Sequence, residues 1–196
     1  MGPCFYPAGH IWHYIPAYWL HLQTENAEVI IKFGHLVIHS LINVLVAKIS
    51  YLYFGNKRQE AQLIAFSMLA NKETRGYYSS MFNDEIMMLY LLLAVYFLIK
   101  SKPIVASFFL TLGLSVKAGM LLLIPSFLGS IQMNHGTIKL VTCIVLIIGF
   151  QVVIALPFVL FGESTVADYI QRSKLIGAGR NGIAGAAAFW DYLAAH

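Results

Sequence analysis

The stretch "LVTCIVLIIGFQVVIALPFVLFG", from Leu140 to Gly162, decides the fold class because its 23 residues carry no charged side chain. At about 1.5 Å of rise per residue, a helix of this length crosses about 30 Å of hydrocarbon. The whole chain is 59% hydrophobic and only 11% charged, whereas about a quarter of the residues of a soluble domain are charged. The sequence therefore predicts an all-α protein, a polytopic bundle of transmembrane helices.

Other apolar segments precede this one. His35–Phe54 is the first expected span, Ala61–Leu69 is too short to cross alone, and Ile86–Ile99 becomes a plausible span when extended back to Phe82. Pro103–Ile138 is too long for one upright helix and barely long enough for two. We expect one membrane domain over residues 1–196: an aromatic luminal or interfacial loop that enters a short helix (1–34), helices (35–162), and a polar to Gly/Ala-rich tail (163–196).

The basic residues lie mainly at the ends of the apolar segments. The formal net charge is +4, from 13 Lys and Arg against 9 Asp and Glu. The positive-inside rule places Lys57/Arg58 and Lys100/Lys102 on the cytosolic side. The N-terminal segment and "FND" (82–84) then lie together on the luminal side. No basic stripe with interleaved aromatics is present, so we expect membrane lipid and no nucleic acid as a partner.

Lys117, the one formal charge between Pro103 and Ile138, is the most informative single residue. A lysine at the centre of a membrane helix costs about 2.5–3.5 kcal/mol on insertion scales. Such a residue usually faces a cavity or an anion, which favours contact with a phosphate or pyrophosphate. The alternative is a lysine near a helix end.

Several other polar residues have both a structural and a functional interpretation. Asn83 and Asp84 suit the start of a helix as caps, and Asp84 also suits a sugar hydroxyl or a cation. His35 and His39 share a helical face, but no third ligand is suitably spaced, so a packed or hydrogen-bonded role is favoured over a metal site. We expect neither a metal nor a cofactor. Arg172 and Arg180 suit either a substrate phosphate or anionic lipid headgroups.

Four motifs occur in an order that resembles a known family. They are "GPCFYPAGH" (Gly2–His10), "MFND" (Met81–Asp84), "LSVKAGMLLLIPSFL" (Leu114–Leu128) and "GFQVVIALPFVL" (Gly149–Leu160). Together they are similar to the ER α-1,3-mannosyltransferases of N-linked glycan assembly, glycosyltransferase family 58, which use dolichyl-phosphate-mannose. The resemblance covers most of the chain from Gly2 to about Arg180.

The resemblance implies a multi-pass GT-C-type enzyme of the endoplasmic reticulum membrane. Such an enzyme moves mannose from dolichyl-phosphate-mannose to a dolichyl-pyrophosphate-linked five-mannose oligosaccharide, inverts the anomeric carbon and needs no nucleotide sugar. Carried over by position, the residues that bind substrate are Tyr6, Pro7, His10, Asn83 and Lys117, with Arg172 and Arg180 as further candidates for phosphate.

The chain also departs from the family pattern. Family members carry an acidic "EIDW"-like motif before "YPAGH", whereas the first acid here is Glu25, and "SVKAG" stands in place of "SVKMN". We therefore expect a truncated bundle whose catalytic base lies outside this chain, with Asp84 a weak candidate. A small transporter lined by Lys117 and Asp84, or a non-catalytic membrane subunit, is the alternative. Transporters typically carry matched broken helices, and only one candidate break is present in this sequence.

Overall fold

The computed structural model describes residues 8–55, 57–70 and 83–161. Every regular element in that part of the chain is a helix, which confirms the all-α prediction. The elements are α1 (Ala8–Gln23), α2 (Ala27–Tyr53), α3 (Arg58–Ala70), α5 (Asn83–Ile99), α6 (Pro103–Val116), the 3₁₀ helix η1 (Ala118–Leu123) and α7 (Ile124–Phe161). The expected tail, 163–196, lies outside the described residues.

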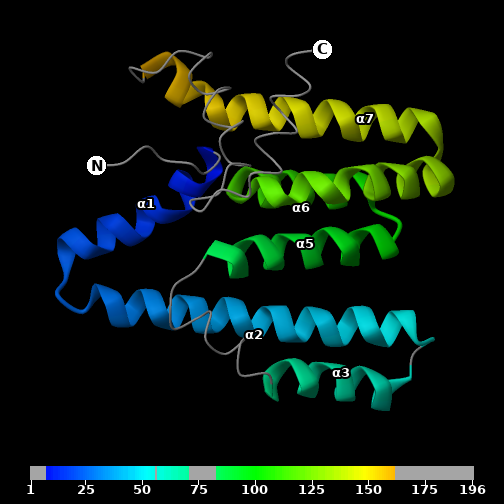
Figure 1. Cartoon of the computed structure of the whole chain (residues 1–196), viewed down its shortest axis with the longest axis horizontal. Helices are drawn as coiled ribbons and strands as arrows, with labels where there is room; N and C mark the ends of the chain where they lie inside the picture. Colours follow the sequence, from blue (N-terminus) through cyan, green and yellow to red (C-terminus); the bar gives the residue numbers. More distant parts are fainter. Residues whose placement is uncertain (1–7, 56, 71–82, 162–196) are drawn as a thin grey trace, which may run out of the picture.

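The helices lie side by side with their axes roughly parallel, in the order α3, α2, α5, α6, α7 (Figure 1). α1 crosses obliquely beside the start of α5 and touches α2, α6 and α7. A hydrophobic core of buried residues is formed between α5, α6, η1 and α7. Ala94 and Ala106 are fully buried there, and such small side chains let membrane helices approach closely.

The described part of the N-terminal segment contains more helix than the loop with a short helix expected for residues 1–34. Helix α1 already begins at Ala8, and α2 begins at Ala27, eight residues before the predicted start at His35. Pro16 inside α1 works against a helix, but contacts to other helices compensate. One of these is the bond that Trp12 Nε1 donates to Ile154 O on α7, 3.2 Å away.

The long apolar stretch from Pro103 is divided into two parts at Lys117. Pro103 occupies the first turn of α6, where its missing N–H costs nothing. The helix ends at Lys117, which has extended backbone angles of φ −145° and ψ 123°. Lys117 therefore lies in a break between α6 and η1 and not at the centre of a helix. This agrees with the alternative of a lysine near a helix end.

α7 is interrupted at Gly136, where φ is 79° and ψ is 173°. Glycine tolerates a positive φ because it has no Cβ atom. The chain reverses direction at this point, so that the part after Gly136 runs back over α6 (Figure 1). The helix predicted over 140–162 corresponds to this returning arm.

Among the residues that the structure describes, two segments are long and apolar enough to cross a membrane: Ala27–Tyr53, and Ala118–Pro157, which includes the reversal at Gly136. Large apolar side chains point outward from both. They include Val29, Phe33 and Val37 on α2, and Val145, Ile148 and Val152 on α7. An exposed apolar surface of this extent is typical of contact with lipid or with another protein surface.

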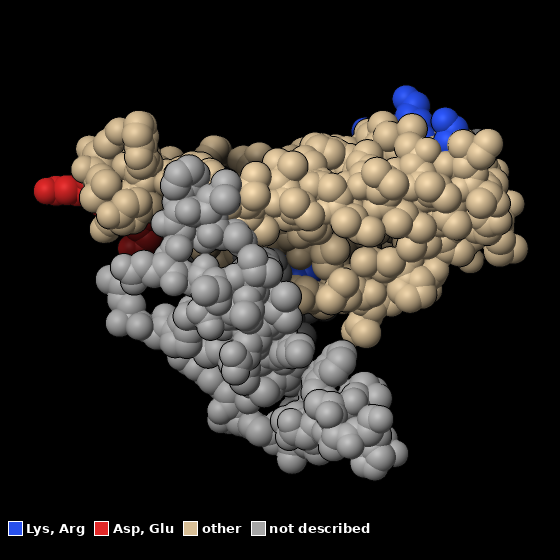
Figure 2. Space-filling view, turned by 90° about the horizontal axis from the view of Figure 1, so that it is seen from above, with Lys and Arg blue, Asp and Glu red and all other residues tan. Residues whose placement is uncertain are grey.

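The two ends of the bundle differ in charge. One end carries Lys57, Arg58, Lys100, Lys102 and Lys139, at the turns between helices. The other carries Glu25, Glu28, Asp84 and Glu85 together with Lys32 and Lys117, while Glu60 accompanies Lys57 at the basic end. Figure 2 shows blue cations gathered at one extremity and red carboxylates at the opposite one. The charge pattern used in the sequence analysis therefore corresponds to a real polarity of the folded chain.

Replacing Gly9 by alanine is expected to lower the free energy of unfolding by about 1–3 kcal/mol, because the site has no room for a methyl group. A Cβ atom on Gly9 would lie 2.1 Å from Ser115 Oγ, so α1 would have to move away from α6. The measurement is the midpoint of denaturant unfolding in detergent, followed by circular dichroism. Gly34→Ala is the matched control, since nothing lies within 4 Å of its added Cβ atom, and it should leave the midpoint unchanged or raise it.

Candidate active site

The first turn of α5 is the point where the polar residues of the bundle meet. Asn83, Asp84 and Glu85 are consecutive, and consecutive helical positions point about 100° apart. Each side chain therefore faces a different neighbour. Asn83 meets α1, Asp84 meets the break after α6, and Glu85 meets α2. The helix N-terminus also favours the two carboxylates electrostatically.

Asp84 forms an ion pair with Lys117, in which Nζ donates to Oδ1. The two side chains are 28% and 35% exposed, so a ligand can reach the pair. The break after α6 is what allows this contact, because the extended backbone at Lys117 ends the helix next to the start of α5. The ammonium is thus held by a carboxylate at the open side of the bundle.

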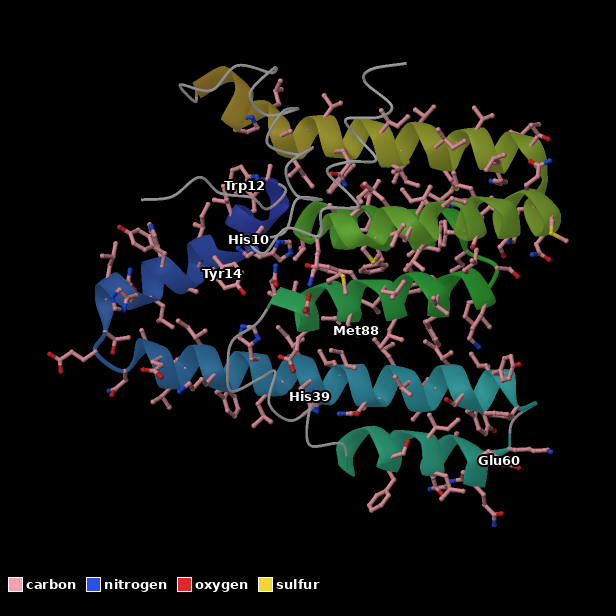
Figure 3. The ribbon with its side chains drawn as sticks, viewed as in Figure 1. His10, Trp12, Tyr14, His39, Glu60 and Met88 are labelled. Carbon is pink, nitrogen blue, oxygen red and sulfur yellow. The ribbon has the colours of Figure 1, made fainter. Side chains whose placement is uncertain are left out.

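Asn83 is 3% exposed, and its amide Nδ2 donates to His10 Nδ1 across 3.3 Å. An amide N–H can only donate, so Nδ1 of His10 must accept and carry no proton. Burial lowers the pKa of His10 below its ordinary value near 6.5, and the neighbouring His13 lowers that pKa further. His10 is therefore neutral at pH 7. Figure 3 shows His10 and Tyr14 on the same helix beside the start of α5, and their ring centres lie 4.7 Å apart with the planes tilted by 43°.

His13 extends the cluster toward the interior. Its Nδ1 lies 2.6 Å from the carbonyl of Gly9, and its Nε2 lies 2.8 Å from the hydroxyl of Tyr90 on α5. A carbonyl can only accept, so Nδ1 carries the proton and Nε2 accepts from Tyr90 when the ring is neutral. Tyr90 cannot be identified from the sequence, because a tyrosine within an apolar helix has no distinguishing signal.

Glu85 is the residue that sequence reasoning misses most clearly. It is 3% exposed, and its two carboxylate oxygens lie 3.2 Å from His35 Nδ1 and 3.1 Å from His39 Nδ1. Both histidines come from one face of α2, as their spacing predicts, and His39 is labelled in Figure 3. The structure therefore shows His35 and His39 in the hydrogen-bonded role that the sequence favours over a metal site. Within the described ranges, no group of three or more His, Cys, Asp or Glu is arranged for a metal ion.

The structure brings together four of the predicted site residues: His10, Asn83, Asp84 and Lys117. The other four, which are Tyr6, Pro7, Arg172 and Arg180, lie outside the described residues. The assembled group offers an ammonium for an anion, next to an amide and an imidazole that are hydrogen-bonded to each other. This combination suits a ligand with both a phosphate and a sugar.

In a comparison with protein families, residues 1–176 match the family described as ALG3 protein. Among curated proteins, the chain is 28% identical over 168 residues to the Dol-P-Man:Man(5)GlcNAc(2)-PP-Dol alpha-1,3-mannosyltransferase of Kluyveromyces lactis, covering 80% of this chain and 35% of that protein. It is 25% identical over 190 residues to a probable enzyme of the same name from Dictyostelium discoideum, covering 81% of this chain and 42% of that protein.

The aligned part of the chain thus covers 35% and 42% of the length of these two curated relatives. No solved structure matches it. The family match includes all four of the motifs quoted above, from Gly2 to Leu160, and continues past them into the polar segment after the last apolar helix.

Proposed function

The chain belongs to the ALG3 family, and from this premise we propose that it carries part of a dolichyl-phosphate-mannose-dependent α-1,3-mannosyltransferase. The acceptor is the dolichyl-pyrophosphate-linked five-mannose oligosaccharide named for both curated relatives. The single observation that carries the proposal for this site is the Asp84–Lys117 pair. It places a cation beside the polar residues His10 and Asn83 at one end of an apolar bundle. Family membership favours this function over a transporter or a non-catalytic subunit.

The proposal places the bundle across the endoplasmic reticulum membrane as a multi-pass, GT-C-like protein. The end with Lys57, Arg58, Lys100 and Lys102 faces the cytosol by the positive-inside rule. The first turn of α5 then opens to the lumen. Both substrates have a polar head on a polyprenyl anchor, so a site at the luminal mouth of a helical bundle reaches the head while the anchor stays in lipid.

In the proposed reaction, a hydroxyl of the acceptor mannose attacks the anomeric carbon of the donor mannose. The new C–O bond forms as the bond to phosphate breaks, and dolichyl phosphate leaves with the electron pair. Negative charge grows on the phosphate oxygen in this step. The ammonium of Lys117 stabilises that charge when it exchanges Asp84 for the phosphate, which is the kind of preorganised interaction that lowers a barrier.

The proton of the acceptor hydroxyl needs a general base. Asp84 stays a weak candidate for this role, because its carboxylate is bound to Lys117 in the structure and is released only when Lys117 exchanges it for the phosphate. We propose His10, Asn83, Tyr6 and Pro7 for the sugar contacts; Asn83 acts through the bond from its buried amide to His10. Arg172 and Arg180 are proposed as further cations for the lipid-linked phosphates.

The test uses cells that lack their own α-1,3-mannosyltransferase and accumulate the five-mannose lipid-linked oligosaccharide. The gene product that contains this chain is expressed, its membrane insertion is verified by protease protection, and the lipid-linked oligosaccharides are sized. We expect a six-mannose species in which the added mannose is removed by an α-1,3-specific mannosidase. An unchanged five-mannose species, with the protein correctly inserted, would contradict the proposal.

A further inference from the structure

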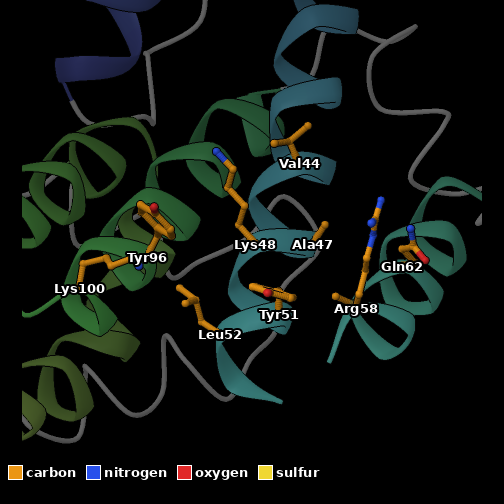
Figure 4. Close-up of a pocket in the computed structure, with 10 residues that line it drawn as sticks. Val44, Ala47, Lys48, Tyr51, Leu52, Arg58, Gln62, Tyr96 and Lys100 are labelled. Atoms are coloured by element: carbon orange, nitrogen blue, oxygen red, sulfur yellow. The ribbon is translucent and has the colours of Figure 1, made fainter. Parts of the chain in front are cut away.

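A groove lies at the end of the bundle opposite the candidate active site, between α2, α3 and α5. Its volume is about 450 Å³. Figure 4 shows its lining: Lys48 and Tyr51 come from α2, Arg58 from α3, and Tyr96 and Lys100 from the end of α5. None of these residues takes part in the polar cluster around Asp84, so the groove needs its own explanation.

The groove combines an apolar wall with several cations. Val44, Ala47, Leu52 and Ala61 supply aliphatic surface from the facing sides of α2 and α3. The charged side chains on it are Lys48, Arg58 and Lys100, and the lining contains no acid. Among the described residues, none of these three cations forms an ion pair.

The cations differ in depth along the bundle. Arg58 begins α3 and Lys100 follows α5, so both stand at the basic end. Lys48 lies five residues before the end of α2, inside the candidate span Ala27–Tyr53. A lysine in such a place is favoured when an anion is near it. The Lys100 ammonium is 6.0 Å from the centre of the Tyr96 ring, which keeps it over the groove.

We propose that this groove binds one anionic glycerophospholipid of the cytosolic leaflet. Its phosphate lies among Lys48, Arg58 and Lys100, and an acyl chain runs along the aliphatic wall. Basic pockets between membrane helices on the cytosolic side recognise such headgroups. The groove's positive charge and the absence of a lining acid complement an anion, while its aliphatic wall complements an acyl chain rather than free phosphate. The inference goes beyond mannose transfer and rests only on the proposed membrane orientation.

The experiment uses the chain in phosphatidylcholine nanodiscs that contain a trace of phosphatidylserine with a photoreactive acyl chain. Phosphatidylcholine with the same photoreactive chain is the parallel probe. We expect phosphatidylserine to label peptides of α2, α3 and α5 at least fivefold more than phosphatidylcholine. The triple variant Lys48→Gln/Arg58→Gln/Lys100→Gln should lose this preference, since each cation near an anionic headgroup contributes roughly fivefold.

Lys57→Gln is the matched control, because Lys57 precedes Arg58 at the same end but does not line the groove. It should keep the full preference. The triple variant Lys48→Arg/Arg58→Lys/Lys100→Arg retains the charges and should also keep most of the labelling, which separates loss of charge from misfolding. Excess soluble glycerophosphoserine should not compete, because it lacks the acyl chain.

Equal labelling by both lipids would overturn the proposal, and would mean that bulk lipid or protein surface fills the groove. The proposal would also be overturned if the glutamine variant kept the preference for phosphatidylserine, or if the charge-retaining variant lost it. Full competition by glycerophosphoserine would overturn it as well. Lipid labelling is measured without any sugar donor, so its result does not depend on the outcome of the mannose-transfer assay. Protease protection of the basic end would reveal a wrong orientation independently.

Discussion

Lys117→Met lowers mannose transfer by about 100-fold or more, if its ammonium stabilises the departing dolichyl phosphate as proposed. Removal of one preorganised group that meets developing charge typically costs 10²–10³-fold. Methionine preserves the length and the apolar stem of lysine, so the variant removes little besides the charge. The measurement is the initial rate of mannose transfer from dolichyl-phosphate-mannose in microsomes of the deficient cells, normalised to the amount of inserted protein.

Two further variants separate a phosphate contact from a purely structural ion pair. The exchange Asp84→Lys/Lys117→Asp restores opposite charges between α5 and the break after α6 but moves the ammonium to the other helix. Transfer at the wild-type rate by this exchanged pair would show that only the pairing matters, which contradicts the proposed phosphate contact. Lys139→Met is the control, since Lys139 lies on α7 at the opposite, basic end; it should leave the rate unchanged.

Glu85→Ala is expected to have the largest effect on stability, lowering the free energy of unfolding by about 3–5 kcal/mol. The reason is that Glu85 is 3% exposed and accepts contacts from His35 and His39, which are also buried. Removing the Glu85 carboxyl group leaves the two buried imidazoles without the partner that compensated their burial. The measurement is the midpoint of unfolding in mixed micelles, monitored by helical circular dichroism.

Glu28→Ala is the matched control for Glu85. Glu28 pairs with Lys32 on α2 at 2.5 Å, but both side chains are largely exposed. Exposed pairs of this type contribute about 0–1 kcal/mol, so this variant should shift the midpoint only slightly. If the two variants gave similar shifts, the buried contacts between α2 and α5 would not be an important source of stability.

The sequence predicts the apolar helices well because their signal is local. The start of α5 follows from a cap-like Asn83 and two acids before an uncharged run, and the start of α6 follows from Pro103. The α1 region is predicted less well. Its helix contains Pro16 and is held by contacts such as Trp12 to Ile154, 142 residues away, which no local pattern reveals.

The candidate site also contains some residues that the sequence predicts and others that it does not. Lys117 and Asp84 are identified from the cost of charge near an apolar segment, and the structure shows that they form one pair. The role of Glu85 depends on histidines 46 and 50 residues before it. The spacing of those histidines shows that they share a helical face. It does not show which helix packs against that face, because any of several acids could be the partner.

The reversal at Gly136 has a consequence for biosynthesis. A continuous α7 of 38 residues would be about 57 Å long, nearly twice the hydrocarbon thickness. Because the chain turns back at Gly136, its two arms can leave the ribosome and partition into the bilayer together as a helical hairpin. His135 and Lys139 flank the tip of that hairpin, so in the proposed orientation neither has to be translocated. A larger residue at position 136 would then impair membrane insertion of the nascent chain, which would lower the amount of folded protein and not its catalytic rate.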